Sequence, residues 1–197
     1  MRTVQVLVIA TILLLLPQTG RADRASWYYR LALQGGGFIV SDGKMNSDEM
    51  PLGPLVGPEH TFLWEVNRQH QHLLGFSGAC YFGFFFTDDP GTTLNINLSL
   101  AYWYQIRGQE AGDGPYFRFN FGLTAAEVHH KSDEEKKKEA FIWMPYLVIG
   151  PSLKIGWGYG WPLHPTVRFT MGANYELGVG VFGNVINALY LDMGFLF

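Results

Sequence analysis

The sequence predicts an all-β protein, an antiparallel β-barrel that crosses a membrane with eight strands. Three observations predict it: apolar side chains recur at every second position, charged residues are scarce, and the final segment alternates up to the last residue. Aromatic and charged residues each make up 16% of the chain, which also has 24 glycines. Because a soluble domain normally carries more charge, we expect much of the surface to face something other than water.

Two segments show the alternation most clearly. Between residues 94 and 107, Ile96 and Leu98 share one face of a strand, whereas Asn95 and Asn97 share the other. Residues 167–181 repeat this period, and a helix would scatter both sets around its circumference. Soluble sandwiches and barrels also alternate, but they put charge on the outer face. Here the second face is rich in Gly, Asn and Ser, which favours a barrel in a membrane.

The N-terminus is typical of a secretory signal peptide. Arg2 supplies positive charge, residues 4–16 are almost wholly apolar, and Gly20 and Ala22 place small residues at the cleavage-critical positions. The apolar run is shorter than the roughly 18 to 20 residues that a membrane-spanning helix needs. We expect cleavage after Ala22, giving a signal peptide (1–22) and one barrel domain (23–197). The only cysteine, Cys80, lies far from that point, so we expect neither a lipid anchor there nor an intrachain disulfide.

The last predicted strand has apolar residues at every second position and ends in phenylalanine, with Leu189, Leu191, Met193, Phe195 and Phe197 on one face. In this it resembles the large family of bacterial outer-membrane barrels, in particular the small OmpA/OmpX-type class, and no subfamily is identified. The resemblance implies a Gram-negative cell envelope and an outer-membrane location. It also implies that these five residues are the C-terminal signal read by the barrel-assembly machinery.

Eight strands are predicted, at residues 26–40, 61–70, 72–87, 93–107, 115–128, 140–160, 165–182 and 184–197. An even number puts both termini in the periplasm. The extracellular loops are then residues 41–60, 88–92 and 129–139 and the tight turn at Gly183-Asn184. The sixth strand contains Pro145 and Pro151, and proline removes a hydrogen bond from a sheet. A turn at residues 150–152 would give ten strands, or would leave 61–70 outside the membrane.

Several charged residues are predicted to face the lumen: Arg30, Glu65, Arg107, Arg118, Lys154, Arg168, Glu176 and Asp192. An eight-stranded barrel is just wide enough for its own side chains, and a buried charge needs a partner. We therefore expect a solid lumen of ion pairs. A small porin-like channel, the alternative, needs ten or more strands.

A catalytic role is a second alternative, with His130, Ser132 and Glu135 as the candidate residues. They are a base, a nucleophile and an acid within the predicted 129–139 loop. The first two are superficially similar to the His-x-Ser of the lipid A deacylase family, which would imply a lipid A-modifying enzyme. Because such residues are common in charged loops, we expect a solvated loop there, and we expect neither a cofactor nor a metal site.

The predicted function is a structural or surface-binding role, carried by the extracellular loops of a monomeric barrel. Its predicted partners are outer-membrane lipids and lipopolysaccharide, with the barrel-assembly machinery during biogenesis. The net charge of −3, and the acidic neighbours of the basic run at 136–138, argue against nucleic acid as a partner. The sequence does not identify an extracellular ligand.

Overall fold

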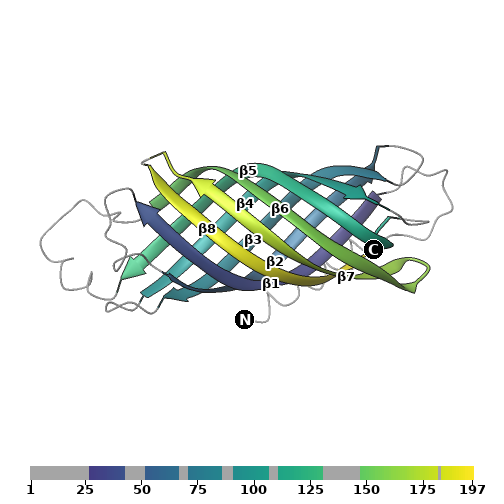
Figure 1. Cartoon of the computed structure of the whole chain (residues 1–197), viewed down its shortest axis with the longest axis horizontal. Coiled ribbons are helices and arrows are strands. Elements are labelled where there is room, and N and C mark those ends of the chain that lie inside the picture. The colour runs from purple at the N-terminus through teal and green to yellow at the C-terminus, as the bar shows by residue number, and fades with distance from the viewer. Residues whose placement is uncertain are drawn as a thin grey trace, which may run out of the picture.

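The computed structural model describes residues 27–42, 52–66, 71–85, 91–106, 111–130, 147–181 and 183–197. Its strands are β1 (Trp27–Asp42), β2 (Leu52–Glu65), β3 (His72–Phe85), β4 (Gly91–Gln105), β5 (Gly114–His130), β6 (Leu147–His164), β7 (Val167–Val179) and β8 (Asn184–Leu196), as Figure 1 shows. Among these residues, no helix is long and apolar enough to cross a membrane. The predicted signal peptide, residues 1–22, lies outside the described residues.

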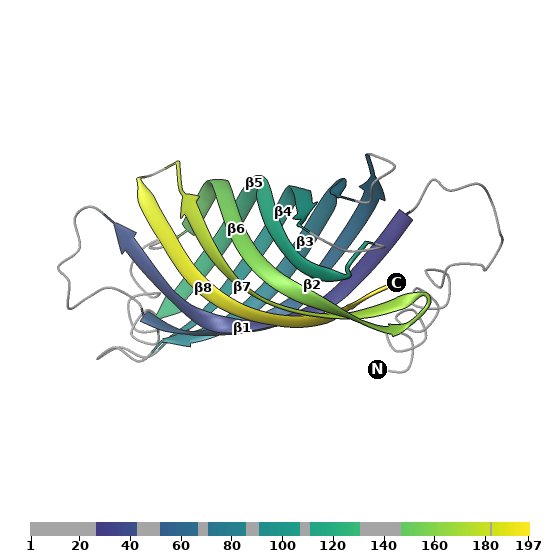
Figure 2. The same cartoon turned by 45° about the vertical axis from the view of Figure 1, so that its right-hand side comes forward.

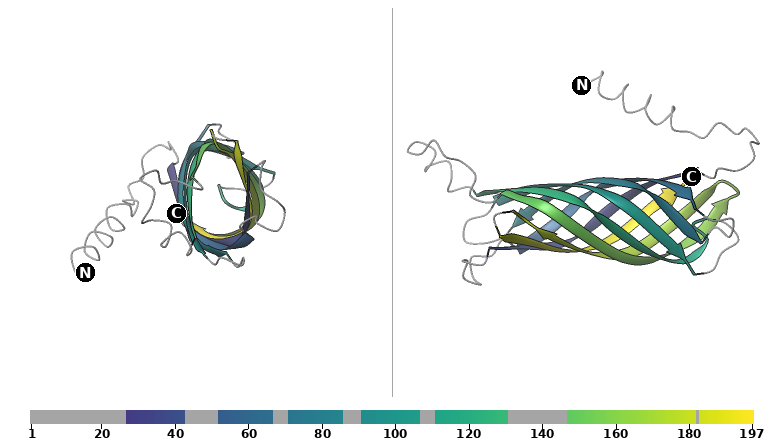
Figure 3. Two further views of the ribbon diagram at one scale, coloured as in Figure 1. Left: turned by 90° about the vertical axis from the view of Figure 1, so that its left-hand side faces the viewer. Right: turned by 90° about the horizontal axis from the view of Figure 1, so that it is seen from above.

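The eight strands close into one antiparallel barrel. Each strand pairs with the next along the chain, and β8 pairs with β1. Figure 2 shows the strands running obliquely around the barrel, and the end-on view in Figure 3 shows the closed ring. A row of paired residues that starts at Arg30 of β1 and passes through all eight strands arrives at Ile186, whereas Arg30 pairs directly with Leu196. This offset between residues 186 and 196 is the shear of the barrel, and it requires strands tilted by roughly 35–45°.

Side chains alternate between the two faces of the wall because successive residues of a strand point to opposite sides. Leu98 of β4 and Leu191 of β8 point outward and are 65% and 69% exposed, whereas their neighbours Asn97 and Tyr190 point inward and are buried. The burial pattern of β2 alternates in the same way along almost its whole length. The outer face is therefore mainly apolar and the inner face mixed, the reverse of a soluble barrel.

The prediction of eight strands is confirmed, and the ten-stranded alternative is wrong. β6 runs without interruption from Leu147 to His164, and Gly150, Pro151 and Ser152 pair in register with β5. Pro151 points outward and is exposed. Its fixed φ angle fits an extended backbone, so the proline costs one possible hydrogen bond without making a turn.

The prediction for the second strand is wrong in its boundaries. β2 spans Leu52–Glu65 rather than 61–70, so residues 52–60 of the predicted loop are in the barrel wall. This segment contains two Gly-Pro pairs, which are typical of turns, but here they follow the alternation of the strand: Pro54 and Pro58 point outward, and Gly53 and Gly57 point inward. At Gly57 a side chain would overlap the carbonyl oxygen of Cys80, so glycine permits the close approach of β3 there.

Other predicted boundaries shift by a few residues. β4 begins at Gly91 and β5 ends at His130, so the barrel wall includes the margins of the predicted loops 88–92 and 129–139. β6 occupies 147–164 instead of 140–160. The turn before β8 is where it was predicted, because Gly183 has a φ of 85° and Asn184 begins the strand.

Candidate functional site

Five charged side chains meet in the middle of the lumen, and we call them the ionic layer: Arg30, Glu59, Arg118, Lys154 and Asp192. They come from β1, β2, β5, β6 and β8 and are at most 3% exposed. The curvature and shear of the barrel bring these strands together, since the residues are far apart in the sequence.

Glu59 is the centre of the ionic layer because it accepts from all three cations. Its Oε1 lies 3.1 Å from Nη1 of Arg30 and 2.6 Å from Nη1 of Arg118, and its Oε2 lies 2.8 Å from Nζ of Lys154. Asp192 joins the two arginines a second time, with 2.7 Å to Nη2 of each. The attraction between these groups offsets the cost of burying their charges.

Neutral polar side chains also bond to the cations of the ionic layer. Nε of Arg30 donates to Oγ1 of Thr170 at 2.9 Å, and Nε of Arg118 donates to Oδ1 of Asn174. Lys154 donates to Oε1 of Gln34 at 3.1 Å and to the Tyr81 hydroxyl at 2.7 Å. Each cation is thus bonded to neutral groups as well as to carboxylates.

The predicted inward residue Glu176 lies beside the ionic layer. It is fully buried, and its Oε1 accepts from Nδ2 of Asn97 at 2.9 Å. Its backbone is in register with Lys154 on the adjacent strand. With Glu176 included, three cations face three carboxylates, so this part of the lumen carries no net charge.

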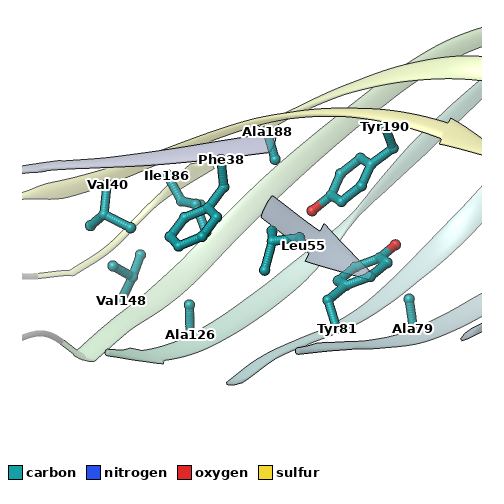
Figure 4. Packing of buried hydrophobic residues seen from close by; sticks show 10 residues of the cluster. All are labelled: Phe38, Val40, Leu55, Ala79, Tyr81, Ala126, Val148, Ile186, Ala188 and Tyr190. Carbon is teal, nitrogen blue, oxygen red and sulfur yellow. The ribbon is translucent and has the colours of Figure 1, made fainter. Parts of the chain in front are cut away.

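An apolar cluster fills the lumen on the side away from the chain termini, and we call it the loop-side cluster: Phe38, Val40, Leu55, Ala79, Tyr81, Ala126, Val148, Ile186, Ala188 and Tyr190. In Figure 4, Phe38 and Val40 point across the lumen toward Ala126 and Val148. The stacked rings of Tyr81 and Tyr190, 4.8 Å apart, adjoin the ionic layer because Nζ of Lys154 lies about 5 Å from each.

A second apolar cluster, the terminus-side cluster, lies on the other side of the ionic layer and comprises Leu63, Leu73, Ala101, Trp103, Ala111, Tyr116 and Leu196. Trp103 and Tyr116 stack with ring centroids 4.5 Å apart, and the guanidinium of Arg30 lies 5.4 Å from the Trp103 ring. The lumen is therefore filled in three successive layers, apolar, ionic and apolar.

Residues 111–113, directly before β5, lie in the barrel mouth at the terminus side. Ala111 is fully buried in the terminus-side cluster, and Gly112 adopts a φ of 84°, where a side chain would overlap Leu196. Asp113 then accepts from Nε of Arg168 at 3.0 Å. Arg168 also donates to the carbonyl of Pro165 at 2.8 Å, so this predicted lumen residue fixes two connections at the mouth rather than joining the ionic layer.

Polar side chains on the outer face are bonded to tyrosines. The Tyr29 hydroxyl lies 2.6 Å from Nδ1 of His60, and Nδ1 of His72 lies 2.7 Å from the Tyr102 hydroxyl. In a low-dielectric surrounding, such pairs reduce the cost of exposing a polar group. His72 is thereby placed on the outer face near one end of the barrel.

The remaining predicted residues divide into three groups. Glu65 is half-buried near the end of β2, and Arg107 lies outside the described residues. His130 is the last residue of β5, but its side chain is not among those described, and Ser132 and Glu135 are outside the described residues. No group of three or more potential His, Cys, Asp or Glu metal ligands occurs within the described part of the chain.

Glu59 is the functional residue that sequence reasoning missed. It lay in the predicted loop 41–60, between two Gly-Pro pairs and the start of the predicted strand. The available signal was parity, meaning whether a position is odd or even along the strand. Glu59 continues the inward-facing odd positions of Thr61 and Leu63. A strand with outward prolines would have placed it in the lumen.

No protein-family model matches the chain, and no curated protein matches its sequence. Solved structures do match. The attachment invasion locus protein Ail of Yersinia pestis is 16% identical, with a TM-score of 0.53 over 87% of this chain and 99% of that one. Neisserial surface protein A is 13% identical, with a TM-score of 0.52 over 87% of this chain and 97% of that one.

These similarities show the fold. The chain is a closed eight-stranded antiparallel barrel of the kind found in small bacterial outer-membrane proteins. At this level of identity they do not assign the chain to a subfamily.

Proposed function

We propose that this protein is an outer-membrane barrel with a closed lumen, which serves as a scaffold for surface binding rather than as a channel or an enzyme. The observation that carries the proposal is the filling of the lumen by the ionic layer between two apolar clusters. Because the interior is occupied by the protein's own side chains and the outer wall faces the membrane, the ends of the barrel are the surfaces left for a partner in the aqueous phase.

A membrane location is supported by the outer face. Large apolar side chains such as Leu98, Phe121 and Leu191 are more than half exposed there, which would be unfavourable in water. Aromatic pairs such as Trp27 with Trp64 and Tyr159 with Trp161 lie toward the terminus side. Aromatic residues at one level of a barrel are typical of a membrane–water interface.

The closed lumen argues against conduction. An ion would have to cross the loop-side cluster, then the ionic layer, then the terminus-side cluster, and apolar constrictions oppose the passage of ions. Residues 43–51, 86–90 and 131–146 connect strands at the end away from the termini. We assign the binding role to these connections. Ail, which shares this fold, was solved in complex with the heparin analogue sucrose octasulfate.

Conductance tests the closed lumen directly. The refolded protein is added to a planar lipid bilayer, beside a Phe38→Ala variant that thins the loop-side cluster but leaves the ionic layer complete. We expect no stepwise current from either protein. Reproducible current steps from the folded wild type would make this protein a channel and overturn the proposal.

Surface labelling tests the orientation and the exposed end. One epitope is inserted within residues 131–146, and a matched one is inserted at residues 165–166 in the turn between β6 and β7. On intact cells an antibody is expected to label the first insertion and not the second. Labelling of the second alone would reverse the orientation and remove the proposed binding surface from the cell exterior.

A further inference from the structure

The outer wall has a hollow over β3, β4, β5 and β6 that the closed lumen does not explain. Its volume is about 450 Å³, within the range of roughly 300–1,000 Å³ typical of small-molecule sites. Its lining is formed by Phe76, Ser77, Leu98, Ser99, Leu100, Phe121, Gly122, Leu123 and Pro151.

The register explains the shape of this hollow. Leu98, Leu123 and Pro151 are paired across three strands and form one apolar ridge. Phe76, Leu100 and Phe121 form a second ridge two residues along each strand. Between the ridges runs the row of Ser77, Ser99 and Gly122, whose small side chains are turned away from the outer face. The floor of the hollow is therefore backbone, and Gly122 stays partly exposed although its neighbours along the row are buried.

We propose that this hollow binds one fatty-acyl chain of a membrane lipid. The proposal rests on the membrane location proposed above. Its lining has no charged side chain, and the two serines are only 5% and 8% exposed, so the walls recognise hydrocarbon and not a headgroup. Leu98 and Phe121 lie near the middle of their strands, at a depth that lipid tails reach and headgroups do not.

The hollow opens directly onto the apolar outer face. A tail can enter it from the surrounding bilayer without crossing a polar barrier. A tail seated between the two ridges contacts side chains on both sides and backbone below, whereas a tail on the flat wall contacts one surface only. Because of this extra contact area, the bound acyl chain exchanges more slowly than the other lipid tails around the barrel.

Native mass spectrometry of the full chain tests this proposal. Protein extracted from the outer-membrane fraction is compared with a Leu98→Trp variant, which fills the hollow, and with Leu33→Trp, which changes an exposed leucine near the middle of β1 outside the hollow. A Leu123→Trp variant fills the hollow from the next strand, in case Leu98→Trp does not fold. Folding of each is checked by its heat-dependent mobility on a gel. Delipidated samples are then titrated with dipalmitoyl phosphatidylethanolamine.

We expect wild type and Leu33→Trp to retain one lipid, and the hollow-filling variants to bind the added lipid about tenfold more weakly, equivalent to losing one to two buried methylene groups. The adduct mass distinguishes a phospholipid from lipopolysaccharide. A folded wild type without an adduct, or equal binding by Leu98→Trp and Leu33→Trp, overturns the lipid site alone. Recovery of the folded protein outside the outer membrane instead overturns the proposed function.

Discussion

The inner and outer faces of the same strands differ in which side chains they leave exposed and which they bury. On β8, Leu189, Leu191 and Met193 point outward and are more than half exposed, whereas Tyr190 and Asp192 between them are buried in the lumen. On the outer face, apolar surface is left uncovered, and His60, His72 and Asn187 are each bonded to a tyrosine. On the inner face, charged groups are concentrated and each is bonded to several partners. The interior of this barrel therefore places a network of ion pairs and hydrogen bonds between two apolar clusters.

Removing the central carboxylate should have the largest effect of any single change. Glu59→Gln leaves Arg30, Arg118 and Lys154 buried with one carboxylate fewer between them. We expect the free energy of unfolding to fall by about 3–5 kcal/mol, the cost of leaving buried charge uncompensated. Urea unfolding of the refolded barrel in lipid vesicles, followed by tryptophan fluorescence, measures it.

Glu127→Gln is the matched control, because it makes the same chemical change on the outer face near the end of β5. Glu127 is exposed, so any interaction of its carboxylate is one between exposed groups, and the change should cost about 1 kcal/mol or less. Equal losses for the two variants would mean that the ionic layer is not the main electrostatic support of the fold.

The outer face is tested by placing a charge at two depths. Leu191→Arg lies near the middle of β8, where an arginine facing lipid costs about 2–4 kcal/mol, and Leu52→Arg lies at the end of β2, where the cost falls to about 0–1 kcal/mol. The same unfolding measurement in lipid vesicles compares them. A cost that does not depend on depth would contradict the assignment of this face to a bilayer.

Alternation predicted the faces of most strands because each side chain's direction follows from its parity alone. Once one residue of β8 is assigned to a face, Leu191 is predicted to point outward and Asp192 to point inward. The prediction failed at β2, where Gly57 and Pro58 look like loop residues although the barrel accepts glycine at a close approach and proline on the outer face. Four of the five residues of the ionic layer were predicted to face the lumen, and Glu59 was missed with its strand.

The contacts within the lumen were beyond sequence reasoning for a different reason. Whether Arg30 meets Arg118 or Asp192 depends on the shear, which fixes how far each strand is displaced from its neighbour. Parity carries no information about that displacement. The pair of Asp113 and Arg168 depends in addition on residues 111–113 lying in the barrel mouth, and no periodic pattern marks this.

Alanine substitutions at two glycines are expected to give the smallest change in stability that still distinguishes the two faces. At inward-facing Gly122, an added Cβ would overlap the carbonyl oxygen of Leu98 and the Cα of Ser99, so the backbones of β4 and β5 would have to separate. At outward-facing Gly78, the nearest atom to an added Cβ is Cδ2 of Leu98, at 3.4 Å. We expect Gly122→Ala to lower the free energy of unfolding by about 1–3 kcal/mol and Gly78→Ala to change it by about 0.5 kcal/mol or less. A Gly122→Ala barrel as stable as Gly78→Ala would show that the wall yields easily at this point and that close strand approach does not require glycine there.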